Sequence, residues 1–268
     1  MLLGIDHIVL AAEDPDATAA ELEAGLGLAA TGGGRHDGLG TFNRLIWLGD
    51  AYLELVGVFD RDLAEQSWLG RPVLDSLAGG GGLVTWAIAV DDMAGALRWS
   101  PPDGGLSGPF DGERLRPDGR FVRWRLARPE AVSATAPFLI EHDATGAEWT
   151  PDERVARADE RHPLGGRVRL AGVELATSSP AVAAGRLRRL LAAAVEPAGR
   201  GAVRVRFADH QARFVPVRPR GSTLVDVVAD VPLRTRVAWV GDCAIRLRGT
   251  AGEDAAAEPL RSGESVPV

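Results

Sequence analysis

GIDHIVLAAEDPDA, residues 4–17, decides the fold, because an apolar strand runs directly into a helix start. The strand covers Gly4 to Ala12. Asp14 is placed to cap the helix, and Pro15 suits the first helical turn. The helix continues to about Leu26, and the glycine after it ends the helix. This stretch predicts the strand–helix opening of a module.

Two more strands complete the first module. A glycine-rich segment, residues 32–40, is followed by strands at Phe42 to Leu48 and Ala51 to Val58. Gly49-Asp50 between them is a two-residue hairpin turn. The unit is therefore expected to be a strand, a short helix and then two or three strands.

The same unit recurs along the chain, which indicates one supersecondary module used several times. A second copy opens with the strand at 83–90, and a third, weaker copy opens at Val168. We expect an α+β fold of repeated βαβββ modules, two of them paired into a half-open curved barrel around a cleft. The expected boundaries are module one at about 1–78, module two at 79–148, a charged linker at 149–167, a third degenerate module at 168–249 and a disordered tail at 250–268.

Composition excludes several classes of function. The 268 residues carry a net charge of -7, and all 30 basic residues are arginine. No basic patch is expected, so nucleic acid is not an expected partner. No apolar run reaches membrane-spanning length, and the N-terminus lacks the basic region of a signal peptide. We expect a cytoplasmic protein with a small-molecule partner, able to form a homodimer.

Three polar residues interrupt apolar strands: His7, Glu54 and Glu141. An unpaired buried carboxylate is costly, so each Glu needs a partner. A divalent metal (Zn, Ni, Co, Mn or Fe) is one such partner. The alternatives are a buried His7–Glu54 pair without metal and a Glu141 side chain that reaches water at its strand end. His142, next to Glu141, is expected on the other face of the sheet.

These motifs resemble the vicinal oxygen chelate superfamily, which includes glyoxalase I, extradiol dioxygenases and bleomycin-resistance proteins. IDHIVLAAEDPDA, YLELV and FLIEHD resemble its first- and last-strand signatures. GGRHDGLGTFN, residues 33–43, is similar to a segment of its glyoxalase-like domain family. The resemblance covers about residues 4–165 and implies that His7, Glu54 and Glu141 are the metal ligands. Trp86 stands where His7 would recur, and an indole cannot ligate a metal.

The resemblance implies a metal-dependent lyase, isomerase or dioxygenase in which Glu54 or Glu141 acts as base. The substrate-binding candidates are His36, Asn43, Trp86 and Arg123. Each has a plainer interpretation: His36 as a loop residue, Trp86 as core and Arg123 on a solvated face. A metal-free binding or resistance-type protein that uses the same cleft is the alternative function. In the third module, Gly172 and Asp226 are expected where His7 and Glu54 stand in the first.

Overall fold

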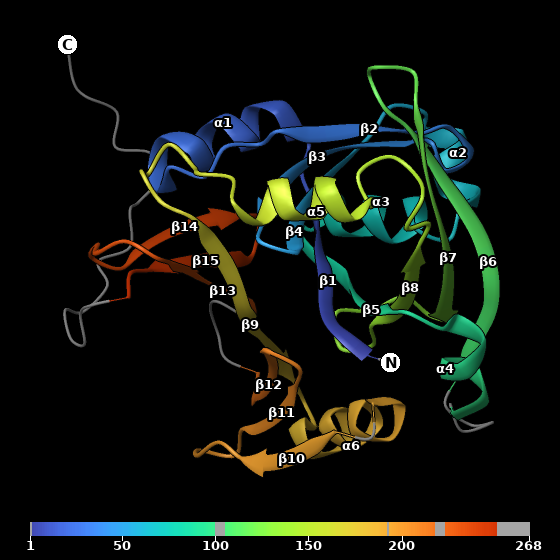
Figure 1. Cartoon of the computed structure of the whole chain (residues 1–268). Helices are drawn as coiled ribbons and strands as arrows, with labels where there is room; N and C mark the ends of the chain where they lie inside the picture. Colours follow the sequence, from blue (N-terminus) through green and yellow to red (C-terminus); the bar gives the residue numbers. More distant parts are fainter. Residues whose placement is uncertain (1, 100–104, 192, 218–222, 251–268) are drawn as a thin grey trace.

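The computed structural model describes residues 2–99, 105–191, 193–217 and 223–250, and it contains two β-sheets (Figure 1). The expected tail at 250–268 lies almost wholly outside the described residues. None of the helices in the described ranges is long and apolar enough to cross a membrane.

Module one has the expected βαβββ order. Its elements are β1 (Leu2–Ala11), α1 (Pro15–Leu26), β2 (Gly32–His36), β3 (Thr41–Leu48) and β4 (Ala51–Val58). The Asp14 side chain accepts hydrogen bonds from the backbone N–H groups of Asp16 and Ala17 at the start of α1. Gly27 ends the helix at φ 73°, a conformation that favours glycine. β1 and β4 pair in parallel, and β3 runs antiparallel to β4.

Module two completes a closed barrel. Two short helices, α2 (Arg61–Gln66) and α3 (Gly70–Ala78), lead into it. Its elements are β5 (Gly82–Val90), α4 (Met93–Trp99), β6 (Leu106–Leu115), β7 (Phe121–Pro129) and β8 (Phe138–His142). β5 is antiparallel to β1 and parallel to β8. The barrel order is β1-β4-β3-β2-β6-β7-β8-β5. The barrel, which was expected to be half-open, is therefore closed at β2 and β6, which pair at Arg35 and Leu115.

The second sheet repeats the module and adds to it. β9 (Val168–Thr177), α6 (Pro180–Leu191), β10 (Ala194–Pro197), β11 (Val203–Phe207) and β12 (His210–Pro216) form a third βαβββ unit. β13 (Thr223–Ala229), β14 (Arg236–Val240) and β15 (Cys243–Arg248) follow. β13 is antiparallel to β9 and parallel to β15, as β5 is to β1 and β8. The segment expected as one degenerate module thus holds a whole module and three strands of a fourth.

The segment at 149–167 packs against the barrel and does not act as a free polar linker. It carries α5 (Pro151–Ala158), and Trp149, Arg157 and His162 are buried. The Arg157 guanidinium lies 4.1 Å from the centre of the Trp47 ring. His162 contacts the Trp47 carbonyl oxygen at 2.8 Å. The expectation that this stretch is too polar for the core was wrong, because Arg157 and His162 are buried through contacts with Trp47.

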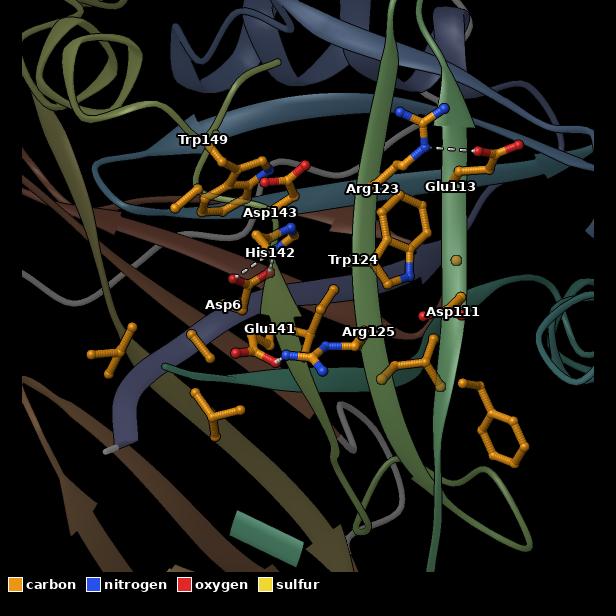
Figure 2. A pocket seen from close by; sticks show the side chains of 18 of the residues that line it. Asp6, Asp111, Glu113, Arg123, Trp124, Arg125, Glu141, His142, Asp143 and Trp149 are labelled. Atoms are coloured by element: carbon orange, nitrogen blue, oxygen red, sulfur yellow. Dashed lines mark hydrogen bonds and ion pairs between the residues drawn. The ribbon is translucent and has the colours of Figure 1, made fainter. Parts of the chain in front are cut away.

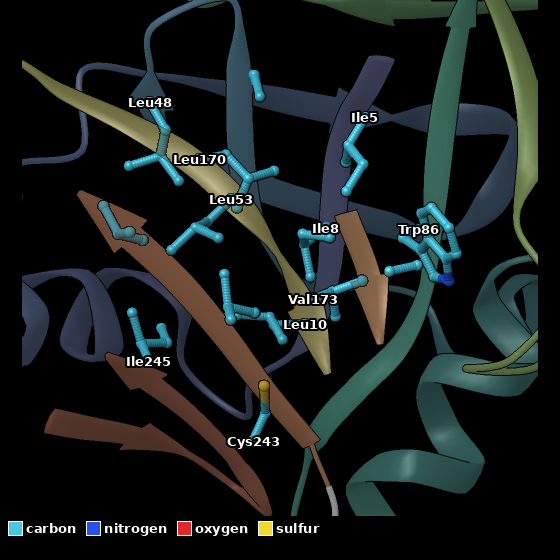
Figure 3. Close-up of a cluster of buried hydrophobic side chains, with 14 of the residues drawn as sticks. Ile5, Ile8, Leu10, Leu48, Leu53, Trp86, Leu170, Val173, Cys243 and Ile245 are labelled. Carbon is cyan, nitrogen blue, oxygen red and sulfur yellow. The ribbon is translucent and has the colours of Figure 1, made fainter. Parts of the chain in front are cut away.

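An apolar core joins the outer wall of the barrel to the second sheet (Figure 3). Trp86 is fully buried in this core, where it stacks at 6.2 Å on Phe207 and donates from Nε1 to the Ala134 carbonyl at 3.0 Å. In the register of β1 and β5, Ala87 pairs with His7 and Trp86 pairs with Ile8. Trp86 therefore faces away from the barrel interior. The prediction that Trp86 binds substrate in the cleft is corrected by this register.

Candidate functional site

A polar cluster lies inside the barrel, on strands of module one. Glu54 on β4 is at its centre: its Oε2 is 3.4 Å from His7 Nε2, and its Oε1 is 3.8 Å from His36 Nε2. Asn43 Nδ2 donates to Glu54 Oε1 at 2.6 Å. All four side chains are buried. The structure thus brings together His7, Glu54, His36 and Asn43 of the predicted residues.

A β-bulge in β1 sets the direction of His7. The pairing of β1 with β5 shifts between Ile5 and His7, so Asp6 is the extra residue. Ile5 belongs to the core outside the barrel, whereas His7 faces inward. Asp6 Oδ1 contacts His7 Nδ1 at 2.6 Å, and His142 Nε2 lies 3.1 Å from Asp6 Oδ2. The bulge therefore joins His7, Asp6 and His142 in one buried chain.

Hydrogen-bond chemistry fixes the orientation of His7. An ionised carboxylate only accepts, so the Asp6–His7 contact requires that Nδ1 donates. This leaves His7 Nε2 facing Glu54. The two atoms, His7 Nε2 and Glu54 Oε2, lie 3.4 Å apart. Tyr52 stacks on the His7 ring at 4.6 Å and restricts its rotation. His7 is therefore fixed between two carboxylates.

Burial and neighbouring charges shift the pKa of three side chains of the site: Asp6, His36 and His142. Burial alone would raise the pKa of Asp6, but His142 and His7 hold that pKa well below its ordinary value. Burial lowers the pKa of His36 to about 4, against the attraction of Glu54. Burial also lowers the pKa of His142, although Asp6 opposes that shift. At neutral pH, Asp6 is ionised and His36 and His142 are neutral.

Two buried atoms in the cluster lack a hydrogen-bond partner: Asn43 Oδ1 and His142 Nδ1. A neutral His142 that donates from Nε2 to Asp6 presents Nδ1 as an acceptor. The amide oxygen of Asn43 is also an acceptor. Unsatisfied buried acceptors are uncommon and costly, so both atoms are suited to a donor group of a ligand.

Two cavities meet at this cluster. The inner one, about 40 Å³, is lined by His7, Asn43, Tyr52 and Glu54, among others. The outer one, about 1290 Å³, is a large open pocket (Figure 2). The residues that line both are His36, Leu39, Trp68, Trp124, Leu126, Ile140, His142 and Trp149. The outer pocket is large enough for the body of a small molecule, and the inner cavity admits only a small group.

Glu141 does not join the cluster. β8 alternates so that Ile140 and His142 face the inner cavity, while Glu141 bonds Arg125 at 2.5 Å on the other face (Figure 2). The expectations for Glu141 and His142 were therefore reversed. Arg123 is exposed, pairs with Glu113 at 3.2 Å and lines the outer pocket only.

The predicted metal ligands do not fit a metal centre as they are arranged. His7 and Glu54 lie together, but Glu141 is on the opposite face of its strand. Within the described residues, no group of three or more His, Cys, Asp or Glu side chains could hold a metal ion.

Sequence reasoning missed Asp6 and His142. Asp6 interrupts the same apolar run as His7, so the criterion that selected Glu54 would also have selected Asp6. His142 was assigned to the wrong face, because Phe138, Leu139 and Ile140 are all apolar and alternation gave no direction. The adjacent Asp6 and His7 in an apolar strand were the sequence feature that could have identified Asp6 as a site residue.

Comparisons with known proteins agree with this architecture. A structure titled as a hypothetical protein from Staphylococcus aureus has a TM-score of 0.76 at 13% identity, covering 93% of this chain and 100% of that chain. A Streptomyces coelicolor methylmalonyl-CoA epimerase in complex with 2-nitronate-propionyl-CoA has a TM-score of 0.40 at 21% identity, covering 53% of this chain and 98% of that chain. No curated protein sequence matches the chain. At 13% identity, the likeness to the Staphylococcus aureus structure shows the fold alone.

The paired βαβββ modules have the arrangement that the resemblance to the vicinal oxygen chelate superfamily implies. The sequence profile of the glyoxalase-like domain matches residues 5–191, and the chain belongs to that family. The match extends beyond the expected end near residue 165, through β9 and α6 of the second sheet. The family expectation is confirmed.

Proposed function

We propose that this glyoxalase-like protein is an enzyme that moves a proton on a small carbonyl compound, in an isomerase or lyase type of reaction. The observation that carries the proposal is His7 held between Asp6 and Glu54 at 2.6 and 3.4 Å, in an inner cavity that adjoins a large pocket. Perturbed, buried acid–base groups in a cleft are typical of catalytic sites.

The mechanism uses Glu54 as the base. Glu54 takes the proton from the carbon next to the substrate carbonyl, and its Oε1 is positioned by the Asn43 amide. The electron pair of the broken C–H bond moves onto the carbonyl oxygen. His7 Nε2 lies next to Glu54 and donates a hydrogen bond to that oxygen, while Asp6 orients the ring. With an α-hydroxy carbonyl compound, return of the proton to the former carbonyl carbon, as the hydroxyl proton passes to the former carbonyl oxygen, gives the isomer. Departure of a leaving group, with its bonding electrons, from the carbon next to the deprotonated one gives the lyase product.

The two buried acceptors without a partner indicate which functional groups the substrate carries. Asn43 Oδ1 and His142 Nδ1 each require a donor, which a hydroxyl group on the substrate supplies. The inner cavity of about 40 Å³ accepts only a small polar group, so the rest of the molecule occupies the outer pocket. We therefore favour α-hydroxy carbonyl compounds as substrates.

The family implies dependence on a divalent metal, and His7 and Glu54 are the predicted ligands that lie together. Because the predicted third ligand Glu141 is bound to Arg125 on the other face, no step above passes through a metal. Asp6 beside His7 also matches the carboxylate partner that a metal-bound histidine commonly has. The test therefore includes metal.

The proposed function is tested by deuterium incorporation in D₂O, followed by ¹H NMR over a panel of 2-oxoaldehydes, α-hydroxy ketones and hydroxy acids. Chelator-treated protein and protein supplied with Zn, Ni, Co, Mn or Fe are run in parallel. We expect exchange at a carbon next to a carbonyl in the chelator-treated protein, and its loss in Glu54→Gln.

Two outcomes would overturn this scheme. Exchange that appears only after a metal is added would assign His7 and Glu54 to metal binding. Tight binding without exchange for any bound compound would favour the alternative, a metal-free binding or resistance-type protein that uses the same cleft.

A further inference from the structure

We propose that Arg128 binds an oxyanion group of the substrate, a carboxylate or a phosphate, at the end of the outer pocket away from Glu54. This inference rests on the proposed use of that pocket by a small-molecule substrate, and it names the class of that substrate. The site consists of Arg128 and the two aromatic rings that flank it, Trp68 and Phe110.

The rings hold the guanidinium in place. The Arg128 Cζ lies 5.4 Å from the centre of the Trp68 ring and 5.0 Å from that of the Phe110 ring. All three residues line the outer pocket, and Phe110 is 42% exposed at its mouth. Cation–π contacts restrain a guanidinium through its flat faces and leave its N–H edge for a planar oxyanion.

Arg128 differs from the other arginines of the pocket. Arg123 pairs with Glu113, Arg125 pairs with Glu141, and Arg154 pairs with Asp50, each at 3.2 Å or less. Among the described residues, Arg128 has no carboxylate partner. Its charge is thus available to a ligand, whereas the other three are already neutralised.

Two acidic residues of the pocket on β6, Asp111 and Glu113, lie on the other side of the strands. Phe110 pairs with Leu126 across β6 and β7, so the inward face of β7 carries Trp124, Leu126 and Arg128. Asp111 and Glu113 pair with Arg125 and Arg123 on the outward face. An oxyanion on the inward side therefore meets Arg128 before it meets these carboxylates.

The position of Arg128 sets the length of the substrate. Trp124 packs at 6.0 Å against His36, which lies next to Glu54. Arg128 lies four positions after Trp124 on β7, which is about 13 Å at about 3.3 Å per residue. The oxyanion and the reacting carbonyl are therefore expected at opposite ends of an elongated molecule.

Calorimetric titration of the full chain tests this assignment without turnover. The probes are ω-oxo carboxylates of increasing chain length, the corresponding ω-oxo alkyl phosphates and the neutral primary amides. We expect Arg128→Gln to weaken binding of the best anionic probe by about 10- to 100-fold, as for loss of a charge-assisted hydrogen bond. Binding of the amide should change by less than about twofold. Arg154→Gln, which removes an already paired arginine of the same pocket, is the matched control and should leave both affinities within about twofold.

Equal weakening for the anion and the amide would overturn the proposal, because Arg128 would then act only by packing. Failure of every anionic probe to bind the unaltered protein, or an equal effect of Arg154→Gln, would also overturn it. Glu54→Gln is expected to keep the anion affinity. If Arg128-dependent binding is found but no compound exchanges deuterium, the proton-transfer function fails and this site stands.

Discussion

The barrel and the second sheet share one strand arrangement but differ in what that arrangement encloses. In the barrel the neighbours run β4-β1-β5-β8, and in the second sheet they run β12-β9-β13-β15. The first strand of each has a bulge at the same place, between Ile5 and His7 and between Leu170 and Gly172. The two regions can therefore be compared position by position.

The second sheet has other residues at the positions equivalent to His7 and Glu54. Gly172 takes the place of His7, and a Cβ there would lie 2.2 Å from the Gln211 carbonyl oxygen. Arg213 on β12 stands where Glu54 stands on β4. Asp226, expected as the counterpart of Glu54, is on β13 opposite Gly172, the place of Ala87. That assignment was wrong because β13 belongs to a fourth, truncated module.

The two regions differ in how far water reaches their charged groups. The side chains of His7 and Glu54 are 5% and 6% exposed. In the second sheet, Asp226 is paired with Arg246 and Arg248, whose side chains are 39% and 43% exposed. Water screens the second set, so charges in the same strand arrangement do not acquire the same reactivity.

The largest expected effect is a loss of deuterium exchange on substitution in the barrel but not at the equivalent position of the second sheet. Glu54→Gln should lower the deuterium exchange rate by about 10²- to 10⁴-fold, because the base is lost while the shape is kept. Arg213→Gln, at the equivalent position of the second sheet, should leave the rate within about twofold. Both rates are measured by ¹H NMR with the same substrate, one whose carbon-bound proton exchanges with D₂O in the unaltered protein. Similar losses in both variants would break the comparison.

The next effect concerns the core where the two regions meet. Trp86→Ala should lower the free energy of unfolding by about 3–5 kcal/mol, because it leaves a cavity between the barrel and the second sheet. Urea unfolding followed by circular dichroism measures this change. A decrease in the free energy of unfolding below about 1 kcal/mol, together with weaker ligand binding, would indicate that Trp86 lines the cleft and not the core.

A third contrast compares a buried ion pair with a more exposed one. Glu148 binds Arg114 at 2.5 Å in the barrel, and both side chains are at least nine-tenths buried. Glu148→Ala should cost about 3–5 kcal/mol, since it leaves Arg114 buried and unpaired. Glu174→Ala breaks the Glu174–Arg213 pair of the second sheet and should cost about 1 kcal/mol or less. Equal costs by urea titration would contradict the role of enclosure.

The smallest effect is a pH dependence in two steps. His36 has a folded pKa of about 4, below its unfolded value of 6.5, so stability should fall as the pH falls from 6.5 to 4. The folded pKa of Asp6 is depressed, so the stability that it contributes is present above about pH 4 and is lost below it. His36→Gln should flatten the first step and Asp6→Asn the second, each by up to about 1.4 kcal/mol per pH unit. A profile that neither substitution changes would contradict both shifts.

The sequence predicted more of the fold than of the directions of the side chains. The modules were readable because caps and turns such as Asp14-Pro15 and Gly49-Asp50 act locally. His7 and Glu54 were found because a charge in an apolar strand needs a partner. The bulge at Asp6 was not readable, and neither was the face of Trp86 or Glu141, because both walls of these strands are buried and a shift of one residue exchanges the faces.

The most direct test of the barrel site is ¹⁵N–¹H NMR of the five histidines in the unliganded protein. The structure predicts that His7 carries a protected Nδ1 proton at low field, and that Asp6→Asn removes this signal. Glu54→Gln should shift the Nε2 resonance of His7, and Arg213→Gln should shift neither signal. The account would be contradicted by an unprotonated Nδ1 on His7, or by resonances that respond to neither the Asp6 nor the Glu54 substitution. Either result would mean that His7 does not make the contacts with Asp6 and Glu54 on which the proposed activity depends.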